Sequence, residues 1–259
     1  MEFEKINIRG INFANVTMDE TVEIAKCFIS DNSENKNHAI YTPNAEIMQI
    51  CIDDKTGDLF EIINSADMVI PDGSGVVLAS KILKTPLKQK VGGFALSNNL
   101  LDYLNETGGK LFLLGSTQEI VETAVKNLNE KYNNIKVFFN NGFFITENEE
   151  NDAVIEKINE CAPDVVFVSM SAPLQEKWIY ANKNKINAKL MLGLGGTIDI
   201  IAGVKKYAPK IFIKLNLEWL YYFIKYPARR KRFWALPKFI IGTYAEKRKI
   251  RKENKKNKK

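Results

Sequence analysis

Two short apolar runs, Ala39–Tyr41 and Met68–Ile70, each end in a polar turn, and this pattern constrains the fold more than any other feature. A segment with helical character follows each turn, and further strand, turn and helix units follow along the chain. Strands that alternate with helices form a mainly parallel sheet with helices on both faces. We therefore expect an α/β fold of the Rossmann-like kind.

The turns after these two runs carry polar side chains. Thr42 and Pro43 predict a helix start, with Thr42 as N-cap and Pro43 in the first helical position. Asp72, between Pro71 and Gly73, places a carboxylate at the end of a strand. Ligands of open α/β sheets bind outside the carboxyl ends of strands, so we expect Thr42, Asn44 and Asp72 to share one crevice. The alternative is that Asp72 is an ordinary turn residue.

Three later turns continue the pattern. Ser116 and Glu119 predict a capping box after the strand 110–114, and this helix start is either an anion site or an ordinary turn. Gln175 lies in the first turn of the helix that follows the strand 163–170. The run 193–197 reads Gly-Leu-Gly-Gly-Thr, which makes Gly195, Gly196 and Thr197 a candidate phosphate cradle.

Charge and aromatic residues separate the C-terminal segment from the rest. Of the 37 Lys and Arg and 31 Asp and Glu, residues 226–259 hold 14 and two, so that segment carries +12 and the remainder −6. We expect an α/β core over residues 1–210 and a helical appendage over 211–259, with a disordered lysine-rich tail from Thr243. Basic residues interleaved with Trp, Phe and Leu favour an anionic membrane surface.

Nucleic acid is the alternative partner for such a basic segment, but no stacking module or helix-turn-helix pattern supports it, so we expect no nucleic-acid binding. No apolar stretch approaches the ~18 residues of a spanning helix, and the charged first residues predict no signal peptide. The three widely spaced cysteines fit a reducing cytosol. We expect a cytoplasmic protein that is peripheral on the inner face of the cell membrane.

Metal ligands are sparse. The sequence contains no Asp-x-Asp pair and a single histidine, His38. Mg²⁺ and Mn²⁺ in enzymes are commonly held by carboxylate oxygens. We therefore expect no metal and no other cofactor.

Several long motifs in this chain resemble those of the WecG/TagA/CpsF family of bacterial glycosyltransferases. They are Thr-Pro-Asn-Ala-Glu at 42–46, Pro-Asp-Gly-Ser-Gly-Val at 71–76, Asn-Gly-Phe-Phe at 141–144 and Ala-Pro-Leu-Gln-Glu-Lys-Trp at 172–178. The resemblance extends over about 11–239. Departures are Ala95 where the family has Asp, Lys90 at a basic position that the family fills with Arg, and Tyr222 near a family Arg.

The resemblance implies transfer of a sugar from a UDP-sugar to an undecaprenyl-diphosphate-linked sugar, with inversion, by a homo-oligomer. The branch most similar to this chain moves N-acetylmannosamine from UDP-ManNAc onto GlcNAc-diphospho-undecaprenol in wall teichoic acid synthesis. Alternatives are transfer of another UDP-hexose and a non-catalytic membrane-docked scaffold. By analogy with the matching positions of the family, Thr42, Asn44 and Gln175 bind the sugars. An inverting transfer needs a base for the acceptor hydroxyl and a site for the leaving diphosphate, so we expect Asp72 to be the base. We expect UDP to bind at Gly195, Gly196 and Thr197, and Arg229 and Arg232 to neutralise diphosphate.

Overall fold

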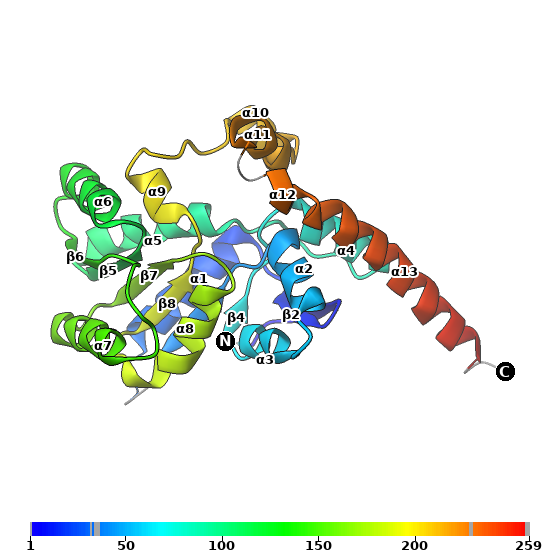
Figure 1. Ribbon diagram of the computed structural model, residues 1–259, viewed down its shortest axis with the longest axis horizontal. Helices are drawn as coiled ribbons and strands as arrows, with labels where there is room; N and C mark the ends of the chain where they lie inside the picture. Colours follow the sequence, from blue (N-terminus) through cyan, green and yellow to red (C-terminus); the bar gives the residue numbers. More distant parts are fainter. Residues whose placement is uncertain (1, 32, 34–36, 228–229, 257–259) are drawn as a thin grey trace.

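The computed structural model describes residues 2–31, 33, 37–227 and 230–256, without the side chains of Arg230 and Lys231. Its centre is a six-stranded sheet in the order β4-β3-β8-β7-β5-β6, and every neighbouring pair is parallel (Figure 1). The strands are β3 (His38–Tyr41), β4 (Met68–Val69), β5 (Lys110–Gly115), β6 (Lys136–Asn140), β7 (Val165–Ser169) and β8 (Leu190–Gly193). The expected α/β fold is confirmed. An antiparallel hairpin, β1 (Lys5–Ile8) with β2 (Ile11–Ala14), precedes it.

Helices cover both faces of the sheet because side chains of buried parallel strands alternate between two apolar cores. In β7, Val166 and Val168 pack into one core, whereas Val165 and Phe167 pack into the other. The first core is closed by α2 (Ala45–Asp53), α3 (Asp58–Asn64), α4 (Ser74–Leu83), α7 (Glu149–Cys161) and α8 (Leu174–Asn182). The second is closed by α1 (Met18–Ser30), α5 (Gly93–Thr107), α6 (Gln118–Lys131) and α9 (Thr197–Ile201).

The order of the strands determines where a ligand crevice forms. The chain leaves β5 toward β6 on one side and leaves β7 toward β8 on the other. Loops that diverge in this way open a crevice at the carboxyl ends of the strands. The turns that carry Thr42, Asp72, Ser116 and Gly195 all follow the carboxyl ends of strands in this sheet.

Two predicted helix caps were wrong. Asn44, and not Thr42, caps α2, because its side-chain oxygen accepts from the backbone N–H groups of Glu46 at 2.9 Å and Ile47 at 3.1 Å. Thr117, and not Ser116, caps α6 through Ile120 N–H. In both cases the displaced residue uses its hydroxyl in a contact with a distant part of the chain, which local sequence patterns do not reveal.

The C-terminal segment forms α10 (Lys210–Lys214), α11 (Glu218–Lys225), α12 (Arg230–Phe233) and the long α13 (Ala235–Lys256). The first part of α13 packs against α2 and α4, and its far end projects from the body (Figure 1). Gly75 in α4 permits this approach, since a Cβ there would lie 2.7 Å from Leu236 Cδ1 and 2.8 Å from Ala45 Cβ.

The expected disorder from Thr243 does not match the structure, because α13 continues to Lys256. Two contacts explain why the helix persists: Thr243 is fully buried, and Arg9 forms an ion pair with Glu246 at 3.0 Å. After Gly242 the sequence contains no glycine or proline, and lysine, arginine and glutamate are good helix formers.

Candidate active site

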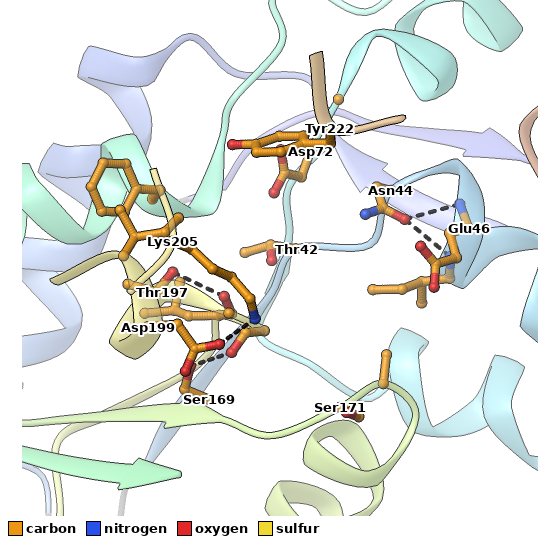
Figure 2. A pocket seen from close by; sticks show the side chains of 18 of the residues that line it. Thr42, Asn44, Glu46, Asp72, Ser169, Ser171, Thr197, Asp199, Lys205 and Tyr222 are labelled. Atoms are coloured by element: carbon orange, nitrogen blue, oxygen red, sulfur yellow. Dashed lines mark hydrogen bonds and ion pairs between the residues drawn. The ribbon is translucent and has the colours of Figure 1, made fainter. Parts of the chain in front are cut away.

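A cleft of about 720 Å³ opens at the carboxyl ends of the strands, and residues of the C-terminal helices α11 to α13 also line it. Figure 2 shows side chains of its lining. Eight of the nine residues singled out in the sequence line it, and Arg229 lies outside the described residues. The eight are Thr42, Asn44, Asp72, Gln175, Gly195, Gly196, Thr197 and Arg232. The sheet therefore brings together residues that are up to 190 positions apart in the sequence.

Asp72 is the carboxylate at the end of β4, and it is partly buried on the cleft wall. Burial raises its pKa to about 6, and the nearby Glu218 carboxylate acts in the same direction. The Gly93 N–H, 3.4 Å from Asp72 Oδ2, and the Lys90 ammonium oppose the rise. A carboxylate with this pKa is mostly ionised at pH 7 and is basic enough to accept a proton from a reacting group.

An aromatic wall adjoins Asp72. Figure 2 shows the Tyr222 ring beside the Asp72 carboxylate. Tyr207 follows on the same wall, with its ring 4.4 Å from that of Phe94 between centroids. Burial raises the pKa of Tyr222 to about 12 and the pKa of Tyr207 above its ordinary value. Both phenols therefore stay protonated at neutral pH and can donate hydrogen bonds to a ligand.

The glycine turn after β8 is held from three sides. Thr42 Oγ1 donates to Gly193 O at 2.9 Å, and Gly195 N–H donates to Gln175 Oε1 at 2.8 Å. The Ser169 hydroxyl donates to Gly195 O. Gly195 itself has φ +56°, in the left-handed region that favours glycine. The turn is thus fixed in shape before a ligand arrives.

These contacts change what two of the residues contribute. Gln175 is buried, and its amide also donates to Glu176 Oε1 at 2.8 Å, so its side chain supports the turn. The Thr197 hydroxyl donates to Leu194 O at 2.9 Å and is buried. Both line the cleft, but these hydrogen bonds are to other groups of the protein. Neither contact was evident from the sequence, because each depends on the local path of the turn.

Two ion pairs connect the C-terminal helices to the core across the mouth of the cleft. Arg232 of α12 lies 3.5 Å from Glu46 of α2, between Nη1 and Oε1. Glu218 of α11 pairs with Lys90 in the segment that precedes α5. Asn44 lies nearby with its oxygen used by the cap, and Figure 2 shows its amide nitrogen directed toward the cleft interior.

Sequence reasoning missed a polar group on the opposite wall. Ser116 Oγ donates to Asp199 Oδ1 at 2.6 Å, and Asp199 Oδ2 accepts from the Lys205 ammonium (Figure 2). All three line the cleft. The sequence pattern predicts a helix cap at Ser116, and neither Asp199 nor Lys205 belongs to a recognisable motif. Their proximity follows from the fold, which places the turn after β5 beside α9.

The family model described as "Glycosyl transferase WecG/TagA/CpsF family" matches residues 6–253. This chain belongs to that family. Enzymes from Staphylococcus aureus strains MW2 and COL are each 38% identical to it over 248 residues, which cover 96% of this chain and 95% of theirs. Both carry the name N-acetylglucosaminyldiphosphoundecaprenol N-acetyl-beta-D-mannosaminyltransferase. The expected family is confirmed, and the protein is a glycosyltransferase.

The three positions at which this chain departs from the WecG/TagA/CpsF pattern lie at different places relative to the cleft. Tyr222 lines it beside Asp72, and Lys90 approaches it through the pair with Glu218. Ala95, one residue after the cleft-lining Phe94, is not among the residues that line it. The tyrosine at position 222 therefore changes the surroundings of Asp72 relative to other family members, whereas the alanine at position 95 does not line the cleft.

Across residues 2–31, 33, 37–227 and 230–256, no group of three or more His, Cys, Asp or Glu side chains is arranged to hold a metal ion. No helix in these ranges has the length and apolar character needed to cross a membrane.

Proposed function

We propose that this glycosyltransferase moves N-acetylmannosamine from UDP-ManNAc to GlcNAc-diphospho-undecaprenol, with inversion, as a step of wall teichoic acid synthesis. The names of the Staphylococcus aureus relatives support the acceptor and the sugar. Their similarity extends over nearly the whole chain and includes the segments that build the cleft. Transfer of another UDP-hexose to a lipid-linked sugar is the second candidate, because Tyr222 alters the wall beside Asp72.

The placement of Asp72 carries this proposal. Its carboxylate accepts the proton of the acceptor hydroxyl, while that oxygen attacks the anomeric carbon from the face opposite the diphosphate. The bond between the anomeric carbon and the diphosphate oxygen then breaks, and UDP leaves with the electron pair. Position on the cleft wall and a pKa of about 6 suit Asp72 to this role at neutral pH.

The leaving diphosphate needs positive charge or hydrogen-bond donors. We propose that transfer is metal-independent and that Arg229 and Arg232 contribute this charge, with the turn at Gly195, Gly196 and Thr197 facing the nucleotide. Arginine suits the role because it binds phosphate oxygens in a bidentate way and stays charged. Turnover in excess EDTA tests the proposal. Activity that disappears in EDTA and returns with Mg²⁺ would contradict it.

The C-terminal helices supply the proposed contact with the inner face of the cell membrane, where the lipid-linked acceptor resides. Large apolar side chains are exposed there, among them Ile211, Leu215, Ile224 and Trp234. Such side chains beside basic residues suit an anionic lipid surface. We also propose a homo-oligomer, and light scattering of the purified protein tests this by measuring its molar mass in solution.

A transfer assay tests the function. Purified protein receives UDP-ManNAc, UDP-GlcNAc or UDP-glucose with a short-chain GlcNAc-diphospholipid acceptor, and UDP release and product mass are measured. We expect product with the mass of one added N-acetylhexosamine from UDP-ManNAc, and little from the other donors. Product only from another donor would support the second candidate. Absence of product from all three donors would contradict the proposed donor and acceptor.

A further inference from the structure

Lys205 lines the cleft but has no role in the proposed transfer steps. Its ammonium lies directly beside the glycine turn: a Cβ placed on Gly196 would lie 3.5 Å from Lys205 Nζ. Its side chain is 31% exposed, so it reaches the cleft and is not packed in the core. A flexible cation therefore stands next to the turn that faces the nucleotide.

Asp199 holds this cation in the ligand-free structure. One oxygen of Asp199 accepts from Ser116 Oγ at 2.6 Å, and the other accepts from the Lys205 ammonium. The two partners use different oxygens, so Asp199 keeps the Ser116 hydrogen bond when Lys205 moves. Lysine carries three donors on a flexible four-carbon stem, which permits it to exchange one anionic partner for another.

The charge of the cleft explains why such an exchange is needed. Among the described residues that line it, four are acidic, namely Glu46, Asp72, Asp199 and Glu218, and two are basic, namely Lys205 and Arg232. Glu218 is paired with Lys90, which lies outside the lining, so the excess negative charge is that of Asp72. A nucleoside diphosphate that enters beside this carboxylate requires a cation close to its phosphates. Arg232 is 49% exposed at the mouth, whereas Lys205 is beside the glycine turn.

We infer that Lys205 binds the diphosphate of the nucleotide-sugar donor and that Asp199 holds its ammonium in place until the donor arrives. The inference rests on the proposed function, since it assumes a nucleoside diphosphate donor. Lys205 is then a substrate-binding residue that stabilises the leaving UDP. Asp199 and Ser116 are positioning residues that keep the cation on the correct wall of the cleft.

Binding measurements with UDP and with uridine separate charge recognition from support of the wall. Calorimetry is run on the full chain for wild type, Lys205→Met, Lys205→Arg and the control Lys206→Met. Lys206 is the next lysine in the chain, but it is exposed and does not line the cleft. It therefore controls for the loss of one lysine charge from this segment. We expect Lys205→Met to weaken UDP binding by about 10- to 100-fold, as loss of a hydrogen bond to a charged group does.

The uridine measurements and the other variants complete the test. Uridine, which lacks phosphate, should bind wild type and Lys205→Met alike, Lys205→Arg should recover most of the UDP affinity, and Lys206→Met should match wild type. Equal UDP affinity in wild type and Lys205→Met would overturn the inference. Equal weakening of UDP and uridine would also overturn it, because Lys205 would then only support the wall. Wild-type protein that binds no UDP would instead contradict the proposed function itself.

Discussion

Asp72 destabilises the folded protein at neutral pH, because burial raises its pKa to about 6 from an ordinary value near 3.8. A raised folded-state pKa gives a stability contribution that is complete below the unfolded pKa and is lost as the pH rises through about 6. We predict that Asp72→Asn gains stability relative to wild type between about pH 4 and pH 6. The gain reaches up to about 3 kcal/mol and then levels off. Denaturant unfolding across this pH range measures it.

Asp53→Asn is the matched control, because the hydrogen bond from Lys238 lowers the pKa of Asp53. Its difference from wild type should have the opposite sign: a stability loss at neutral pH that disappears as the pH falls. A difference between Asp72→Asn and wild type that stays constant with pH would show that Asp72 is not held in an unfavourable environment.

At this same scale the sequence indicated some residues and missed others. The turn at Asp72 and the motif at Thr42 were visible because strand ends and turn residues have local signatures. The Thr42 and Ser116 hydroxyls were assigned as caps, yet one contacts Gly193 and the other Asp199. Lys205 was missed, because its place beside Gly196 arises only when the chain folds.

At the scale of elements, a buried aromatic side chain anchors α13 to the core. Phe239 is fully buried between α13 and the core, and Arg9 also lies over its ring at 5.4 Å. We predict that Phe239→Ala lowers the free energy of unfolding by about 3–5 kcal/mol, through lost burial and the cavity left behind. Ile241, two residues later on the same helix, is 69% exposed.

Chemical denaturation compares the two variants. Ile241→Ala should stay within about 0.5 kcal/mol of wild type, as surface changes generally do. Equal effects of the two substitutions would mean that α13 does not dock through Phe239.

The strands of the core were predicted closely, because runs buried on both faces are continuous and apolar. The length of α13 was not predicted from the sequence, because its stability depends on contacts with Arg9 and with the first apolar core.

At the scale of the whole molecule, the exposed apolar side chains of the C-terminal helices should hold the enzyme on lipid. Removing the entire appendage is a poor test, because Phe239 belongs to the core. We predict that the double change Ile224→Ala and Trp234→Ala weakens binding to anionic liposomes by about tenfold or more, since burying one large apolar side chain is worth about 1.5–3 kcal/mol. These side chains are 61% and 75% exposed.

Liposome co-sedimentation is the measurement, with Ile145→Ala as control. Ile145 is 57% exposed and lies in the loop before α7, which is not part of the C-terminal helices. Wild-type binding by the double variant would place the lipid contact elsewhere.

The division of charge between core and appendage was evident from the sequence. The order of strands was not, because strand pairing depends on contacts between distant segments.

The most direct test of the central claim, that Asp72 is the base of a sugar transfer in this cleft, is the single-turnover rate of Asp72→Asn with UDP-ManNAc and a soluble GlcNAc-diphospholipid acceptor. Loss of a general base lowers rates by about 100- to 10,000-fold. We predict a loss in this range, with UDP affinity by calorimetry close to that of wild type. A rate within a few-fold of wild type, at unchanged UDP affinity, would remove Asp72 from the mechanism.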